Sequence, residues 1–149
     1  MATLREYLGV AARWGAFERA RNQSVLRVYA LQGHLVRVDT TTAAASVTPD
    51  GLFHLGHSKE PRPDLPQGQV SRSGRDPLGW PLTTTGMAGN TADAPLYRPE
   101  VATVRQITGR TGLRYVGDCK MAPMGTRAES VAHQDDMEVP MESYGGLVP

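Results

Sequence analysis

The sequence has few of the residues that build a large hydrophobic core. Its 149 residues include one isoleucine and two phenylalanines, and Leu, Ile, Val and Phe together make up about 19% of the chain. That share is just under the level at which a weak core is expected. The net charge is only +1, so the high charge typical of disordered chains is missing as well. We therefore expect a chain that folds around a small core.

Cysteine and long apolar runs are also scarce. Cys119 is the only cysteine, which excludes an intrachain disulfide and favours a cytoplasmic location. A thiol nucleophile needs a base, and no histidine lies near Cys119 in the sequence. No apolar run approaches the ~20 residues that a membrane-spanning helix requires, and the N-terminus lacks the ordered regions of a signal peptide. We expect a soluble cytoplasmic protein with no membrane partner.

Charge is unevenly distributed along the chain. Residues 1–38 carry six arginines and two glutamates, whereas residues 128–149 carry five acidic residues and no lysine or arginine. A basic N-terminal segment is typical of proteins that bind phosphate groups and release counterions. The alternative is a helix whose charged face is simply solvated, and the charge pattern alone leaves both interpretations open.

The spacing of apolar residues in the first half of the chain predicts a helix followed by strands. Apolar residues at helical intervals predict the helix over residues 4–20. Residues 24–39 favour two strands joined by a turn at Gly33, and the second strand ends at Asp39. A further strand is expected over residues 52–58, and a proline-rich loop over residues 59–69.

The second half of the chain shows clearer boundaries. Residues 76–79 predict a turn and residues 80–87 a strand. A helix is expected to end at Gly109, and a buried strand to follow over residues 113–121. Thr126 and Glu129 have the spacing of a capping box, which predicts a short helix over residues 126–134 before a last, poor strand over residues 137–141. This order of elements favours a mixed α/β sheet.

Two aspartates follow predicted strands. Asp39 comes directly after residues 35–38, and Asp118 follows Tyr115 and Val116 through Gly117. In open α/β sheets, ligands bind at the carboxyl ends of the strands. Carboxylate oxygens suit Mg²⁺, and two such ions roughly 4 Å apart can activate the attacking oxygen and stabilise the leaving oxygen of a phosphodiester. The alternative is that both aspartates only form turns after their strands.

Five segments stand out when they are read together: VRVDTTTAAAS, GHSKEPRPDLPQ, DPLGWPL, GMAGNTADAPLY and GLRYVGDCKMA. In this order they resemble bacterial insertion-sequence transposases of the DDE type. Those enzymes have a ribonuclease-H-like catalytic domain. The resemblance covers most of residues 14–134, and five ordered segments are more specific than any single one.

The resemblance implies an incomplete ribonuclease-H-like catalytic domain over residues 32–149, preceded by a basic helical segment over residues 1–31. It implies that Asp39 and Asp118 are the first two catalytic aspartates and that both are ligands in a two-ion magnesium (Mg²⁺) site. The implied reaction is metal-dependent cleavage of transposon ends and strand transfer into target DNA. The implied partners are DNA, and either a second copy of the chain or a full-length transposase.

The chain also departs from the family pattern. The family's glutamate lies on a helix, commonly in a Tyr-x-x-Glu setting, and none of Glu129, Glu138 and Glu142 has that setting. Serines and arginines in QVSRSGRDPLG, and acids in DDMEVPM, stand where apolar strands are expected. We therefore expect a truncated chain that is catalytically inactive alone. The alternatives are a non-catalytic DNA-binding or regulatory remnant of a transposase, and a fragment that barely folds.

Overall fold

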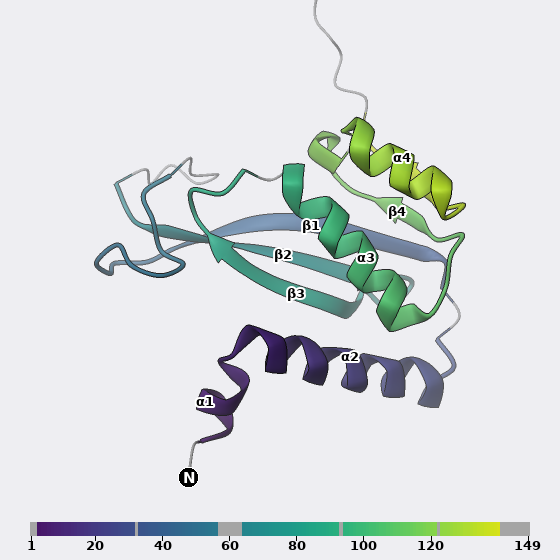
Figure 1. Ribbon diagram of the computed structural model, residues 1–149, viewed down its shortest axis with the longest axis horizontal. Helices are drawn as coiled ribbons and strands as arrows, with labels where there is room; N and C mark the ends of the chain where they lie inside the picture. Colours follow the sequence, from purple (N-terminus) through teal and green to yellow (C-terminus); the bar gives the residue numbers. More distant parts are fainter. Residues whose placement is uncertain (1–2, 32, 57–63, 93, 122, 141–149) are drawn as a thin grey trace, which may run out of the picture.

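The computed structural model describes residues 3–31, 33–56, 64–92, 94–121 and 123–140. Its strands are β1 (Leu35–Ala44), β2 (Gln67–Arg75), β3 (Trp80–Ala88), β4 (Arg114–Val116) and β5 (Asp136–Glu138). They form one sheet in the order β3-β2-β1-β4-β5 (Figure 1). β2 is antiparallel to β1 and β3, whereas β4 is parallel to β1 and β5. The predicted mixed α/β sheet is confirmed.

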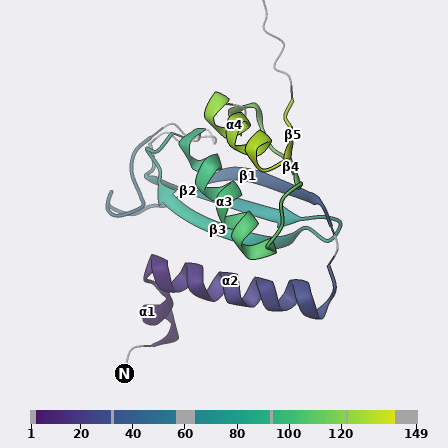
Figure 2. The ribbon, with the colours of Figure 1, turned by 45° about the vertical axis from the view of Figure 1, so that its right-hand side comes forward.

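Helices cover one face of this sheet. The described residues form α1 (Leu4–Leu8), α2 (Ala11–Val28), α3 (Tyr97–Thr108) and α4 (Met124–Ala132), with 3₁₀ turns at Ala94–Leu96 and Cys119–Met121. Both α2 and α3 pack against β3 and contact each other, and α4 lies beside α3 (Figures 1 and 2). No helix among the described residues is long and apolar enough to cross a membrane.

Burial along β1 alternates with every residue, because successive side chains of a strand point to opposite faces. Val36 and Val38 are buried on the face that carries the helices, whereas Arg37 and Asp39 are exposed on the other face. None of the described helices lies on this second face, which we call the open face. It is the face on which Asp39 is presented.

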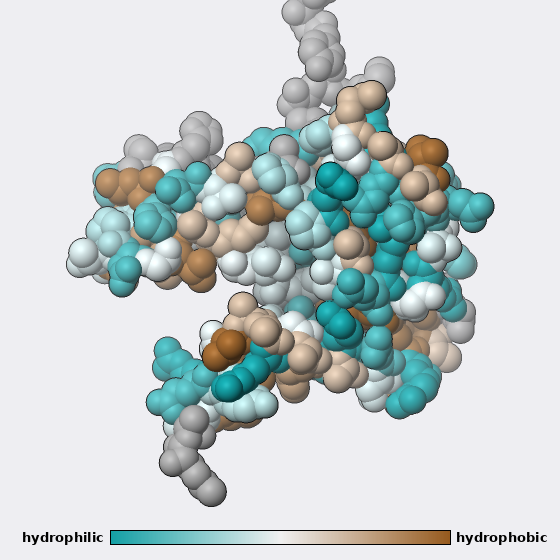
Figure 3. Space-filling view, in the orientation of Figure 1, coloured by the Kyte–Doolittle hydropathy of each residue, from teal (hydrophilic) through white to brown (hydrophobic). Residues whose placement is uncertain are grey.

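The hydrophobic core is small, as the composition predicts. In the part of the chain that the structure describes, ten apolar side chains are buried, and they come mainly from β1, α3 and the β4 region. Figure 3 shows hydrophobic residues scattered among hydrophilic ones over the helix-bearing side. The buried apolar residues are Val36, Val38, Leu82, Tyr97, Val101, Val104, Ile107, Leu113, Tyr115 and Met121.

Polar side chains replace apolar ones where β2 and β3 face the helices. Ser73, Thr83 and Glu100 are buried and hydrogen-bonded to one another, and the Thr85 hydroxyl donates to Glu100 at 3.3 Å. Nearby, Asn22 of α2 donates to the carbonyl oxygen of Leu82 at 2.5 Å. Buried polar groups are tolerated only when they are hydrogen-bonded, so this network holds α2 and α3 to the sheet where apolar packing is thin.

Several predicted elements are confirmed. The turn over residues 76–79 and the strand that follows it are present. Helix α3 ends at Gly109, which has φ +63°, a left-handed conformation that glycine adopts without strain. The last strand is short, as expected, but β5 covers Asp136–Glu138 rather than residues 137–141, and residue 141 lies outside the described residues. The domain boundary at residue 31 stays a prediction.

Other local predictions were wrong. Residues 24–28 belong to α2 rather than to a strand, because continuing the helix packs Leu26 against the core. Propensity is a weak guide where such packing decides. Residues 52–58 form no strand in their described part, because Asp50 and Phe53 pair with each other across a tight turn and leave only His54 to bridge to β2. His57 and Ser58 lie outside the described residues.

The expected boundaries near residues 67 and 126 also differ. Residues 67–69, predicted as loop, belong to β2, since the antiparallel pairing with β1 extends to Gln67. Helix α4 begins at Met124, directly after Pro123, so Thr126 lies inside the first turn and is buried. The predicted capping box is absent because Glu129 binds arginines of α3 instead.

Candidate active site

The prediction that β1 ends at Asp39 was wrong, because Asp39 lies in the middle of this strand. Pairing with β2 continues the strand five residues further, to Ala44. The carboxylate is exposed on the open face, opposite Arg72 of β2. Its Oδ1 accepts a hydrogen bond from the backbone N–H of Thr40 at 2.8 Å. Asp39 is therefore presented by a rigid, centrally placed strand.

Asp118 lies two residues beyond the end of β4 and is half-buried. Its Oδ1 accepts a hydrogen bond of 2.6 Å from the Tyr97 hydroxyl, and one of 3.1 Å from the backbone N–H of Lys120. Tyr97 is the first residue of α3 and is fully buried. The orientation of the Asp118 carboxylate is thus set by the helix layer as well as by its own strand.

The two aspartates come from neighbouring segments, Asp39 from within β1 and Asp118 from just beyond β4. The parallel register pairs Val36 with Tyr115 and Arg37 with Val116, and the next residues but one are Asp39 and Asp118. Close contact continues past the last paired residues, since a Cβ on Gly117 would lie 3.1 Å from the carbonyl oxygen of Val38. The residues that immediately precede the two aspartates therefore lie against each other.

Asp39 and Asp118 are the two carboxylates that the resemblance implies as magnesium ligands. Neither Asp39 nor Asp118 forms an ion pair in the described part of the chain. Arg37, two residues before Asp39, binds Asp76 at 2.7 Å. Mg²⁺ commonly takes one or two carboxylates and completes its shell with waters and substrate phosphate oxygens. Within the described ranges, however, no group of three or more His, Cys, Asp or Glu residues could hold a metal ion.

The other candidate acids do not join this pair. Glu129 binds Arg98 at 2.9 Å and Arg105 at 3.1 Å, and its pKa is lowered chiefly by the hydrogen bond from Arg98. It therefore ties α4 to α3. Glu138 is an exposed residue of β5, and Glu142 lies outside the described residues. The two aspartates stand without a third carboxylate in the described part of the chain.

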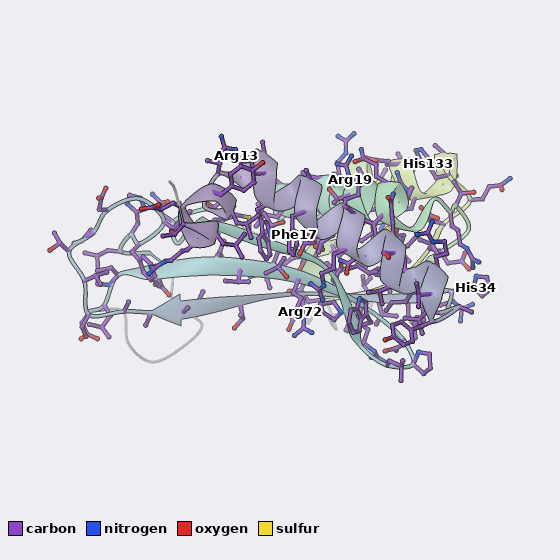
Figure 4. All side chains as sticks on the ribbon, turned by 90° about the horizontal axis from the view of Figure 1, so that it is seen from below. Arg13, Phe17, Arg19, His34, Arg72 and His133 are labelled. Carbon is purple, nitrogen blue, oxygen red and sulfur yellow. The ribbon has the colours of Figure 1, made fainter. Side chains whose placement is uncertain are left out.

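The structure adds two residues that sequence reasoning missed. Tyr97 is 21 positions from Asp118 in the chain, and nothing in its local sequence indicates the contact. Arg72 stands where an apolar strand was expected from the sequence. Its side chain is exposed on the open face, on the opposite side from Arg13 and Arg19 (Figure 4). A shallow hollow of about 570 Å³ runs over this face past Asp39 and Arg72. Successive side chains of a strand point to opposite faces, and this rule applied to residues 67–75 could have placed Arg72 on the open face.

The sheet order, with its helices, is ribonuclease-H-like, as in transposases of known structure. The piggyBac transposase synaptic complex with hairpin DNA matches with a TM-score of 0.55 and 10% identity over 78% of this chain and 25% of that chain. The pre-cleavage Mos1 transpososome matches at 0.52 and 9% over 88% and 43%, and the Mos1 paired-end complex at 0.51 and 9% over 83% and 40%.

At such identities the likeness shows the fold alone. This chain spans less than half of the length of each of these transposase chains. No protein-family model and no curated protein matches the sequence. The ribonuclease-H-like fold confirms the fold class implied by the resemblance, while the bacterial insertion-sequence origin stays a prediction.

Proposed function

We propose that this chain is part of the catalytic domain of a DNA transposase and that Asp39 and Asp118 are two of its metal-binding carboxylates. The observation that carries the proposal is the parallel pairing of β1, which contains Asp39, with β4, which ends two residues before Asp118. The matched folds are those of transposases whose complexes contain transposon ends or hairpin DNA. The proposed substrate is accordingly a DNA phosphodiester.

Each side chain of the site has a role in this proposal. Asp39 and Asp118 would hold Mg²⁺, which when bound polarises the phosphate and activates the attacking oxygen. The Thr40 backbone and the Tyr97 hydroxyl orient the two carboxylates. Arg72, exposed beside Asp39, would contact a DNA phosphate. Rigid strands suit this task, because metal ligands must be held within fractions of an ångström.

We propose further that the chain is catalytically inactive alone. A catalytic pair of metal ions needs more ligands than two carboxylates supply, and the acids nearest in sequence serve other contacts. Glu129 is neutralised by Arg98 and Arg105. The described residues place no third carboxylate beside the pair, so one metal position would lack a ligand and the charge that develops in the transition state would be less well stabilised.

Metal binding and cleavage can be tested separately. Titration with Mn²⁺ as a paramagnetic probe should broaden the amide signals of residues beside Asp39 and Asp118, and Asp39→Asn should abolish this broadening. Asp136→Asn is the matched control, because that carboxylate is exposed on β5. Equal broadening in both variants would refute the site. Mg²⁺-dependent nicking of plasmid DNA that Asp39→Ala abolishes would refute the proposed inactivity.

A non-catalytic role in DNA binding is the second candidate, and the arginines of α2 favour it. Arg13 and Arg19 are exposed on this helix (Figure 4), and Arg13 stacks on the ring of Tyr7 at 4.4 Å. This function predicts a salt-dependent gel shift with duplex DNA that survives Asp39→Ala and Asp118→Ala but weakens in Arg13→Gln and Arg19→Gln. The absence of any shift at low salt would exclude it.

A further inference from the structure

A cleft of about 430 Å³ lies between the C-terminal halves of α2 and α3, away from the two aspartates. These halves lie close together on the helix-bearing side of the sheet in both Figures 1 and 2. Leu26 and Ile107 contribute apolar walls. Arg27, Arg75 and Arg110 also line the cleft, and none of the described residues that line it is acidic. The cleft is therefore basic and partly apolar.

Arg75 is the unusual member of this set. Its side chain comes from β2, points to the helix-bearing side, and is only 3% exposed. One guanidinium nitrogen donates to the carbonyl oxygen of Gly33, but the buried Nε has no hydrogen-bond partner among the described residues. A buried donor without a partner loses its hydrogen bonds to water and forms none in their place, which costs free energy. A guanidinium group normally avoids burial in this state.

The charges around Arg75 add to this imbalance. Burial lowers the pKa of Arg75, and repulsion from Arg110 lowers it further. The acidic neighbour, Asp76, is engaged by Arg37 at 2.7 Å. The C-terminal ends of α2 and α3 contribute about half a negative charge each, which offsets part of the positive charge of the cleft.

We propose that this cleft binds a phosphate group, with Arg75 and Arg110 as its principal ligands. A tetrahedral oxyanion accepts several hydrogen bonds at once, and guanidinium groups match phosphate oxygens in pairs. The phosphate would accept a hydrogen bond from the Arg75 Nε–H, and its negative charge would offset the repulsion between Arg75 and Arg110. The site is independent of Asp39 and Asp118, which belong to another part of the sheet, and goes beyond the proposed metal chemistry.

The phosphate could come from a free small molecule or from the DNA backbone, and the chemistry of the cleft is the same for both. The test begins with inorganic phosphate, titrated at constant ionic strength against chloride while the Arg75 Nε–H and Gly33 and Gly109 amide signals are followed by NMR. We expect saturable shifts at these positions. Arg75→Met and Arg110→Gln should each raise the dissociation constant by about tenfold, the loss expected for a charge-assisted hydrogen bond.

Two variants make the result specific. Arg114→Gln removes an exposed arginine of β4 and should leave phosphate binding unchanged. Asp39→Asn should do the same, which separates a failure of this site from a failure of the metal site. If Arg75→Met does not fold, Arg110→Gln still carries the test. Shifts that do not saturate, or that are equal in wild type and Arg110→Gln, would overturn the proposal.

Duplex DNA then distinguishes the two sources. If a short duplex shifts the Gly33 and Gly109 signals and inorganic phosphate competes with it, the cleft holds a backbone phosphate. If phosphate binds and the duplex leaves these signals unchanged, the ligand is a small phosphate-bearing molecule. Both results support the phosphate site.

Discussion

Tyr97 and Asp118 are joined by a hydrogen bond of 2.6 Å from the phenolic hydroxyl to the carboxylate. Tyr97 is buried at the beginning of α3, whereas Asp118 follows β4. The bond therefore ties the helix layer to the end of the strand that presents the carboxylate. Both hydrogen bonds to the Asp118 carboxylate among the described residues engage Oδ1, so Oδ2 is the oxygen that would bind a metal ion or water.

Replacing Tyr97 by Phe removes this donor and keeps the ring. Unfolding by urea should show a loss of about 1–2 kcal/mol, because hydrogen bonds to charged groups are stronger than neutral ones and half-buried Asp118 can recover some hydration. Tyr29→Phe is the control, since Tyr29 is 70% exposed. Equal stabilities of the two variants would show that the Tyr97–Asp118 bond contributes nothing to stability.

Glu100 should make the fold less stable as the pH rises. Burial raises its pKa from 4.5 to about 7, although hydrogen bonds from hydroxyl groups lower it and Glu18 raises it. Between these two values the folded chain holds a proton that the unfolded chain has lost. The free energy of unfolding therefore falls from pH 4.5 to about 7, by roughly 3 kcal/mol, and then levels off.

Urea unfolding of Glu100→Gln and wild type at several pH values checks this prediction. The contributions of histidines and other acids cancel in the difference between the two free energies of unfolding. The variant should gain stability relative to wild type as the pH rises through this interval. A difference that does not change with pH would show that the Glu100 carboxyl titrates normally.

Asp135 and Asp136 are neighbours, but their substitutions should differ greatly in their effect on stability. Asp135 has a fully buried side chain that binds Arg105 at 2.8 Å and accepts from the Leu113 N–H at 2.9 Å. Asp135→Ala leaves Arg105 short of a partner and should destabilise the fold by about 3 kcal/mol. Asp136→Ala should change stability by less than about 0.5 kcal/mol, because its exposed carboxylate only meets Arg114 at 3.8 Å. Thermal melts of both variants measure the contrast.

Gly117 should tolerate no side chain. A Cβ there would lie 2.9 Å from Sδ of Met121 and 3.1 Å from the carbonyl oxygen of Val38. Met121 can shift but the backbone of β1 cannot easily do so, and we expect Gly117→Ala to lose about 1–3 kcal/mol. Gly15→Ala is the matched control, since nothing lies within 4 Å and alanine favours α2 by about 0.5–1 kcal/mol. If both substitutions stabilise the chain, β1 and β4 are further apart than described.

Local signals predicted the elements that depend on a few neighbouring residues. Gly109 and the 76–79 turn needed only backbone preferences, and β3 followed from its β-rich composition. The failures came where distant packing overrides such preferences. The end of α2 contains residues typical of strands, yet Leu26 is held in a helix against the core. Likewise, the prediction that β1 ends at Asp39 failed because pairing with β2 extends the strand to Ala44.

The sequence by itself determined the small core, the mixed class of the fold and the two aspartates as the acids to examine. These conclusions follow from composition, periodicity and short motifs, which are local properties. Only the tertiary structure decided that β1, which carries Asp39, pairs in parallel with β4, which ends two residues before Asp118. It also decided that Tyr97 binds Asp118, and that the Nε of buried Arg75 has no partner among the described residues. Each of these depends on contacts between segments far apart in the chain, whose register is fixed by packing and hydrogen bonding of the whole sheet.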